Sequence, residues 1–194
     1  DRPEESWSTG FSNKIDGESI YLRMRQKNRC IHRGYQNVGH NGARSQDFVT
    51  QIDALSPPIP GENPYLAFMA YIGNDVCKKH PYDITTDAVF KEAIINGIKK
   101  LDSVAPPGSH LLTMGLVDAT ILWDQMWNLT HPLGATYATV YEFLTCADSN
   151  PCQTFLTSNA TMREYSKQRA AQLSRILQET VQEFKGKLTN LEVD

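Results

Sequence analysis

The sequence lacks any apolar run long enough to cross a lipid bilayer. A membrane-spanning helix needs about 20 apolar residues in succession, and polar residues interrupt every apolar run of this 194-residue chain well before that length. A signal peptide is also absent, and the chain begins at Asp1 rather than at a methionine. We therefore expect the chain to begin at a processing site or at a cut inside a longer protein.

An excess of positive charge is absent as well. The chain has 19 basic and 22 acidic residues and a formal net charge of -3, so it lacks the basic field typical of nucleic-acid-binding domains. We predict no nucleic-acid partner. Basic residues do cluster locally, and we interpret them as a solvated strand face and loop, with a patch for an anionic ligand as the alternative. They are Arg23, Arg25, Lys27, Arg29 and Arg33.

Cysteine is scarce. The four cysteines, Cys30, Cys77, Cys146 and Cys152, do not have the spacing of a zinc site, and the histidines show no metal-ligand spacing either. We predict no metal site. An even number of cysteines suits two disulfides. Because Cys146 and Cys152 are close in sequence, we expect a disulfide between them to close one loop. Cys30 would then pair with Cys77.

Two N-glycosylation sequons begin at Asn128 and Asn159, as Asn128-Leu-Thr130 and Asn159-Ala-Thr161. Sequons are glycosylated, and disulfides persist, in proteins that pass through the oxidising secretory pathway. We therefore predict a secreted or lysosomal (vesicular) protein.

Apolar periodicity predicts strands that alternate with helices. This order is typical of an α/β fold, a three-layer open parallel sheet with helices on both faces, and 194 residues suit one domain. The helix at 161–185 should start at a capping box of Thr161 and Glu164 and stop at Gly186. The predicted elements are a half-buried strand at 17–25, a helix at 43–54, a proline-rich connection at 56–64, a central strand at 65–72, a helix at 86–104, a strand at 109–116, an irregular segment at 118–134 that is either a surface loop or a broken helix, a short helix at 136–144 and a long helix at 161–185.

Two short segments could form an oxyanion hole. One is Asn37-Val-Gly-His-Asn-Gly42-Ala43-Arg-Ser45, and the other is Tyr71-Ile-Gly73-Asn74-Asp75, which ends the strand at 65–72. Ligands of open α/β sheets bind at the carboxyl ends of strands. Each segment alone could be an ordinary turn. The two in this order, with a strand between them, are a more specific signal of an oxyanion hole.

These segments resemble two of the four sequence blocks of the SGNH (GDSL) hydrolase superfamily. The resemblance implies that the backbone N–H of Gly42 and the side-chain amide of Asn74 form the oxyanion hole of a serine esterase. The other two blocks, a nucleophile in Gly-Asp-Ser and a base in Asp-x-x-His, do not occur in this sequence. We therefore expect residues 1–194 to be an internal part of one SGNH hydrolase domain, with an incomplete flavodoxin-like fold.

Longer motifs are similar to the large subunit of the acyloxyacyl hydrolase family. That resemblance implies an esterase that releases secondary fatty acyl chains from lipid A of lipopolysaccharide or from related lipids. It also implies a saposin-like subunit or domain of the same precursor. A calcium site would rest on the resemblance alone, because no Asp-rich loop supports one, and no other cofactor is expected. The motifs are Ile20-Tyr-Leu-Arg23, Cys30-x-His32-Arg33-x-Tyr35-Gln36-Asn37, Gly73-Asn74-Asp75-Val76-Cys77, Gly115-Leu116-x-Asp118 and Asn128-x-Thr130-His131-Pro132-x-Gly134, and the pair Cys146 and Cys152 fits as well.

Other residues are weaker candidates for a role in the site. Asp75 should hydrogen-bond neighbouring backbone, with a direct catalytic role as the alternative, and His131 could line an acyl-chain entrance. A triad within the chain, such as Ser45, His131 and Asp118 or Asp124, is the least favoured arrangement, because Ser45 is better placed to cap a helix. The competing function is a secreted, non-catalytic lipid- or glycan-binding protein on a hydrolase scaffold.

Overall fold

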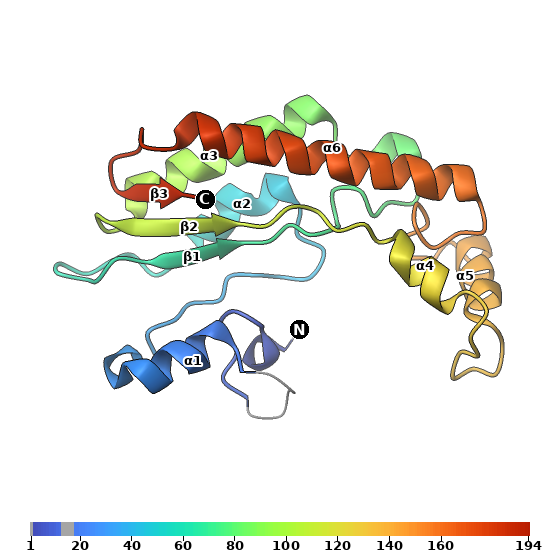
Figure 1. Cartoon of the computed structure of the whole chain (residues 1–194), viewed down its shortest axis with the longest axis horizontal. Coiled ribbons are helices and arrows are strands. Elements are labelled where there is room, and N and C mark those ends of the chain that lie inside the picture. Colours follow the sequence, from blue (N-terminus) through green and yellow to red (C-terminus); the bar gives the residue numbers. More distant parts are fainter. Residues whose placement is uncertain (1, 13–17) are drawn as a thin grey trace.

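The fold is built on a three-stranded parallel sheet. The computed structural model describes residues 2–12 and 18–194. Its strands are β1 (Leu66–Met69), β2 (Ser109–Thr113) and β3 (Leu191–Val193), in the spatial order β1-β2-β3 (Figure 1). Leu66 pairs with His110, and Ser109 pairs with Leu191. The predicted α/β class with a parallel sheet is confirmed, although β1 forms an edge of the described sheet rather than its centre.

Helices connect the strands. The predicted helices at 86–104, 136–144 and 161–185 are confirmed within a few residues, and Asn159, not Thr161, caps the last one by accepting a hydrogen bond from the backbone N–H of Met162 at 3.1 Å. The α-helices are α1 (Ile20–Lys27), α2 (Phe48–Asp53), α3 (Asp87–Val104), α4 (Thr120–Met126), α5 (Tyr137–Cys146) and α6 (Ala160–Phe184); the 3-10 turns are η1 (Pro3–Glu5), η2 (Arg29–Ile31), η3 (Ser45–Asp47) and η4 (Pro81–Asp83).

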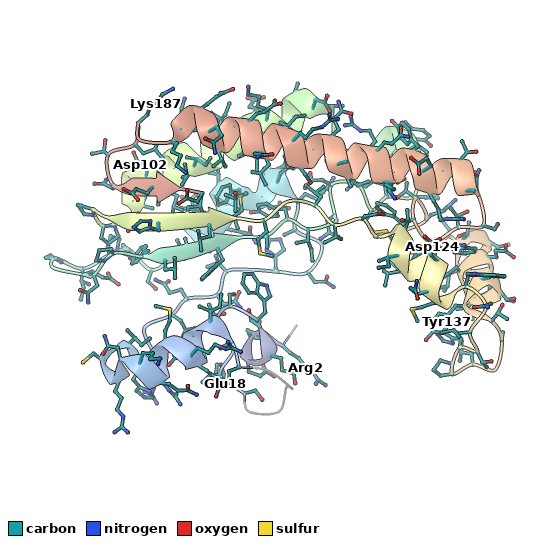
Figure 2. All side chains as sticks on the ribbon, viewed as in Figure 1. Arg2, Glu18, Asp102, Asp124, Tyr137 and Lys187 are labelled. Carbon is teal, nitrogen blue, oxygen red and sulfur yellow. A yellow bond between two sulfur atoms is a disulfide. The ribbon has the colours of Figure 1, made fainter. Side chains whose placement is uncertain are left out.

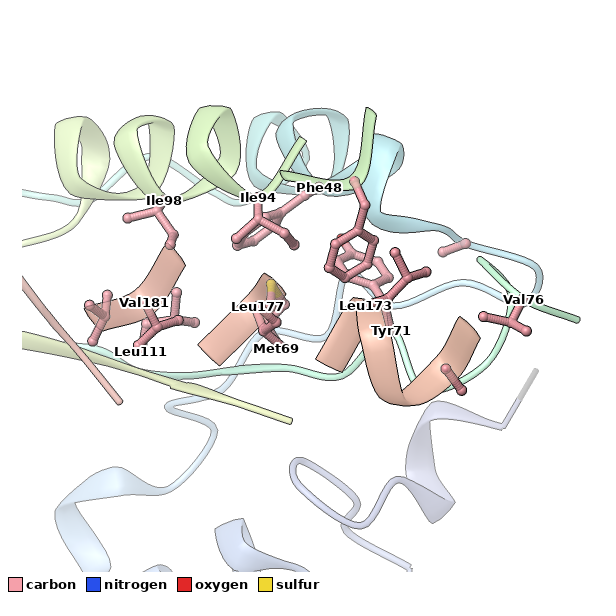
Figure 3. Close-up of a cluster of buried hydrophobic side chains, with 14 of the residues drawn as sticks. Phe48, Met69, Tyr71, Val76, Ile94, Ile98, Leu111, Leu173, Leu177 and Val181 are labelled. Carbon is pink, nitrogen blue, oxygen red and sulfur yellow. The ribbon is translucent and has the colours of Figure 1, made fainter. Parts of the chain in front are cut away.

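The core lies between the sheet and the helices α2, α3 and α6 (Figure 3). Apolar residues spaced three or four apart give α3 and α6 one buried stripe each. The alternating residues of the strands place Met69 and Leu111 against these stripes, whereas Leu66 and Leu112 on the opposite face are exposed. The helices α2, α3 and α6 therefore cover one face, whereas α1 lies on the other side of the sheet (Figure 1), where Trp7, in the segment before it, packs against Phe68. The stripe residues are Phe90, Ile94, Ile98 and Leu101 on α3 and Ala170, Leu173, Leu177 and Val181 on α6.

The strand predicted at 17–25 is wrong, because residues 20–27 form the helix α1. Ser19 caps this helix by accepting a hydrogen bond from the backbone N–H of Leu22 at 3.1 Å. The neighbours Tyr21 and Leu22 are both buried, and Met24 is exposed. A strand with one buried face would not bury two consecutive side chains. Residue 17 lies outside the described residues.

The predicted disulfide pairing is also wrong. Cys77 pairs with Cys152, with their Cα atoms 4.7 Å apart, while Cys30 and Cys146 are free and exposed. The segment after α5 returns to the chain that follows β1, where Thr154 Oγ1 donates to the carbonyl of Val76 at 2.8 Å. This long-range contact brings Cys152 to Cys77.

Strand β3 was not predicted from the sequence. A single carboxylate holds the turn that leads into it, because Asp102 at the end of α3 accepts hydrogen bonds from the backbone N–H groups of Thr189, Asn190 and Leu191 at 2.8 to 3.1 Å. The Leu-Glu-Val strand is too short for a clear alternating pattern. None of the helices in residues 2–12 and 18–194 is both long and apolar enough to traverse a membrane.

Candidate functional site

Asn74 and the turn at Gly42 meet beyond the carboxyl end of β1. The Asn74 side chain donates a hydrogen bond from Nδ2 to the backbone carbonyl of Ala43 at 3.0 Å. The two predicted segments, about 30 residues apart in sequence, are therefore in direct contact. The amide nitrogen of Asn74 carries a second N–H, which this contact leaves free for another acceptor.

Gly42 has the backbone conformation that favours glycine. Its φ is +82°, in the left-handed region that side chains disfavour. No heavy atom outside its immediate neighbours lies within 4 Å of the position that a Cβ would occupy. The turn is therefore open on the side of Gly42, where a ligand atom can approach its backbone.

A buried carboxylate clamps the two segments together. Asp75 and Ser45 are both fully buried. One carboxylate oxygen of Asp75 accepts a hydrogen bond from the backbone N–H of Ser45 at 3.0 Å, and the other accepts from the Ser45 hydroxyl at 2.8 Å. Bonds to a carboxylate are the stronger class of protein hydrogen bond. Asp75 therefore positions the loop that carries Gly42 and has no exposed surface for a substrate, and Ser45 serves the clamp rather than a helix cap.

Several ionisable groups surround this clamp. Partial burial and the nearby guanidinium of Arg44 lower the pKa of Lys78, although neighbouring carboxylates, including Asp75, oppose the shift. Burial, followed by the charges of Asp47 and Asp75, raises the pKa of Tyr71 well above its ordinary value. The Tyr71 phenol therefore stays protonated, and it donates a hydrogen bond to the side-chain carbonyl of Gln51.

A cavity of about 340 Å³ runs along β1 and reaches Ala43 and Asn74. Its walls come from residues 66–72, from the segment 6–9, from the loop 36–40 and from α2. Trp7 closes one side by packing edge-on against Phe68, with ring centroids 5.3 Å apart. The lining is mainly apolar and includes Asn74 and Ala43, the residue after Gly42.

One edge of β1 has no strand partner among the described residues. The carbonyls of Tyr65 and Met69 accept hydrogen bonds from the backbone N–H groups of His110 in β2 and of Met114 just after it, so the backbone groups of the odd-numbered residues of β1 face that strand. In a parallel ladder the alternate residues bond to the opposite side. The backbone N–H and C=O groups of Leu66 and Phe68 therefore point away from β2, toward the cavity that runs along β1.

His131 does not join this site. Its Nδ1 accepts a hydrogen bond from the backbone N–H of Leu133 at 3.1 Å, and its ring packs against Tyr137 with centroids 4.8 Å apart. Tyr137 lies with α4 and α5 at one extremity of the molecule (Figure 2). Asp118 lies near the start of α4 and binds Lys167 at 3.1 Å. The structure therefore does not assemble Ser45, His131 and Asp118 into a triad.

No group of three or more metal-binding side chains occurs within residues 2–12 and 18–194. Both sequon asparagines, Asn128 and Asn159, are exposed. The capping bond of Asn159 uses its side-chain oxygen, which leaves the amide nitrogen, the atom that carries a glycan, accessible.

The sequence signal that could have identified the clamp is the Asp that directly follows Asn74. We expected Asp75 to hydrogen-bond neighbouring backbone; its carboxylate accepts one backbone hydrogen bond, from the N–H of Ser45. The side-chain partner was missed, because Ser45 lies 30 residues away and the sequence does not define that distance in space.

The chain is similar to three acyloxyacyl hydrolases. It is 40% identical over 188 residues to the protein from Homo sapiens, 38% identical over 189 residues to that from Oryctolagus cuniculus and 38% identical over 186 residues to that from Mus musculus. These matches cover 90 to 91% of this chain but only 32 to 33% of the relatives, so the chain spans about a third of their length. No protein-family model matches it.

Proposed function

Because this chain is a homologue of acyloxyacyl hydrolases over about nine-tenths of its length, we propose that it supplies the oxyanion hole of a carboxylic ester hydrolase. The observation that carries the proposal is the hydrogen bond from Asn74 to the Ala43 carbonyl beside Gly42. This bond fixes the amide plane of Asn74 and leaves one of its N–H groups free next to the open turn. Gly42 would contribute the second donor through its backbone N–H.

The chemical task of these two donors is to stabilise negative charge. When a serine hydroxyl attacks an ester carbonyl, the carbon becomes tetrahedral and the carbonyl oxygen becomes an oxyanion. Donors already in place stabilise this oxyanion more than the ground-state carbonyl, so they lower the barrier. Asp75 acts on the reaction only through the position of the loop that carries Gly42.

The nucleophile and the general base would come from parts of the complete protein outside residues 1–194. The unpaired edge of β1 offers a place for a further parallel strand. Such a strand would end beside Asn74, because the carboxyl ends of parallel strands meet at one edge of a sheet. We propose that this strand carries the nucleophilic serine and fills part of the cavity along residues 66–72.

The substrate we propose is a lipid with secondary fatty acyl chains, such as lipid A of lipopolysaccharide. The names of the relatives and the motifs shared with their family support an acyloxyacyl ester. A saposin-like part of the same precursor is the proposed partner. A secreted or lysosomal location is supported by the Cys77–Cys152 disulfide and by the exposed sequons.

Substitution of Asn74 tests this assignment. Loss of one oxyanion donor typically raises the barrier by about 3 to 4 kcal/mol, so Asn74→Ala in the complete enzyme should reduce kcat by about 100- to 1,000-fold with an unchanged fold. The matched control is Asn96→Ala, because Asn96 is an exposed residue of α3. Near-normal kcat in Asn74→Ala would refute the oxyanion role. Lipid binding by a complete protein without any esterase activity would instead identify a non-catalytic binding protein.

A further inference from the structure

Five basic residues are concentrated in α1, in η2 and in the two residues that follow η2. This basic group, here called the basic face, consists of Arg23, Arg25, Lys27, Arg29 and Arg33. Four of the five are exposed, and Arg25 is partly buried. Residues 19–46 contain no Asp or Glu, so the segment has no acidic residue of its own to balance these charges. We propose that the basic face binds the phosphate groups of an anionic lipid surface.

The cations of the basic face have no ion-pair partner within residues 2–12 and 18–194. In the same part of the chain seven other cations form ion pairs with carboxylates. Arg23 and Lys27 are four residues apart on α1 and therefore lie on the same side of the helix. Like charges in this relation destabilise a helix, and a bound anion would remove that repulsion.

Arg33 adds a second unfavourable feature. Its φ is 63°, in the left-handed region that a residue with a side chain disfavours. Glycine would occupy this position without strain. An arginine in such a conformation is consistent with a role for its side chain, because backbone strain of this kind concentrates at functional sites.

A buried tyrosine organises the basic face. The hydroxyl of Tyr21 accepts a hydrogen bond from the backbone N–H of Arg33 at 2.9 Å. The guanidinium of Arg25 lies 5.9 Å from the centre of the Tyr21 ring. Tyr21 also packs against Tyr35, with centroids 4.7 Å apart. Tyr21 thus joins the backbone at Arg33 to α1 and contacts the guanidinium of Arg25.

Apolar side chains next to the basic face favour a lipid surface over a soluble anion. Met24 lies between Arg23 and Arg25 and is 41% exposed. The start of α1 is also joined to the segment at Trp7, because the backbone N–H of Ile20 donates to the Trp7 carbonyl at 3.1 Å. The exposed side chains of this segment are Trp7 and Phe11. Basic residues combined with exposed aromatic and aliphatic side chains are typical of surfaces that bind the membrane interface.

The position of the basic face suits a docking role. Figure 1 shows α1 beyond the β1 side of the sheet, away from α3 and α6. Residues 101–162, which include α4 and α5, contain no Lys or Arg. An anionic surface would therefore attract the molecule through α1 and η2, and the net charge of -3 would disfavour contact through the remainder.

The test is co-sedimentation of the complete protein with lipid vesicles. One set contains equal parts of phosphatidylcholine and phosphatidic acid, and the other contains phosphatidylcholine alone. We expect binding to the first set only, weakened by high salt. Each basic residue near an anionic surface contributes about five-fold in affinity, so Arg23→Gln with Lys27→Gln should weaken binding about 25-fold.

A matched control removes the same charge elsewhere. Arg175→Gln with Lys187→Gln changes two exposed cations of α6 and of the turn that follows it; Lys187 is labelled in Figure 2 on the side of the molecule opposite α1. This variant should keep its vesicle binding within about two-fold of the unaltered protein, because exposed charges more than about 10 Å from a surface are screened at 0.1 M salt. Equal weakening in both double variants would overturn the proposal, since it would show an effect of net charge alone.

Arg33→Gly separates binding from folding. Glycine relieves the strained φ at position 33, so the melting temperature should not fall, whereas vesicle binding should weaken about five-fold. Unchanged binding in this variant and in Arg23→Gln with Lys27→Gln would refute a role for the basic face. Inorganic phosphate distinguishes the source of the anion: complete competition at low millimolar concentration would show a site for free phosphate and would overturn the lipid-surface assignment. These readouts measure binding, so they remain informative whether or not the esterase assignment holds.

Discussion

Removal of the Ser45 hydroxyl or of the Asp75 carboxylate should destabilise the protein by amounts that do not add. A buried hydrogen bond to a charged group contributes about 1.5 to 3 kcal/mol. Ser45→Ala removes the 2.8 Å bond from the hydroxyl and should cost about 2 kcal/mol. Asp75→Ala removes the acceptor of both bonds and leaves a buried N–H and a buried hydroxyl without partners, which should cost about 4 kcal/mol.

The double variant is the decisive measurement. Once Asp75 is absent, the Ser45 hydroxyl is an unsatisfied buried group, and its removal should cost nothing further. The double variant should therefore be about as stable as Asp75→Ala, with a coupling energy of about 2 kcal/mol. Urea unfolding gives the four free energies, and Ser103→Ala serves as a control, because its exposed hydroxyl bonds only within α3 and its loss should cost less than about 0.5 kcal/mol. A double variant whose loss of unfolding free energy equals the sum of the two single losses would refute the clamp.

Three further predictions concern packing, thiols and pH. Gly97→Ala should destabilise the protein by about 2 kcal/mol or more in thermal unfolding, because the new Cβ would lie 1.8 Å from Phe48 Cδ1 where α3 meets α2. Alkylation without reduction should modify Cys30 and Cys146, and mass spectrometry that finds either of them blocked in a disulfide would contradict the pairing. Partial burial raises the pKa of Asp118, but hydrogen bonds from neighbouring side chains lower it by more. The stabilisation lost in Asp118→Asn should therefore be present above about pH 4 and should disappear as the pH falls further through the lowered pKa; a stability difference that persists undiminished in acid would contradict this cause.

Much of the fold follows from periodicity. The helices α3 and α6 and the strands β1 and β2 could be predicted because each carries a long or wholly apolar pattern whose spacing has one structural meaning. The two turn segments could be predicted as neighbours through their resemblance to two sequence blocks of the SGNH hydrolase superfamily, which implies that both contribute to one oxyanion hole. In both cases a short stretch of sequence is enough to make the prediction.

The remaining features depend on contacts that no local pattern defines. Ile20, Leu22 and Met24 alternate as in a strand, but the cap at Ser19 and the burial of Tyr21 produce a helix. Close spacing in sequence favoured the pairing of Cys146 with Cys152, but Thr154 anchors the second cysteine against the chain after β1. β3 depends on Asp102, which is almost 90 residues earlier.

The two proposed oxyanion segments contact each other directly within a chain that spans about a third of the length of its relatives. The bond from Asn74 to Ala43 and the bonds from Ser45 to Asp75 all join residues 43–45 to residues 74–75. These bonds join the Asn74 amide directly to the turn that carries Gly42. Electrostatic stabilisation of an oxyanion requires donors that are already oriented before the charge develops. In the proposed enzyme the Ala43 carbonyl orients the Asn74 amide in this way before a nucleophile reaches the β1 edge.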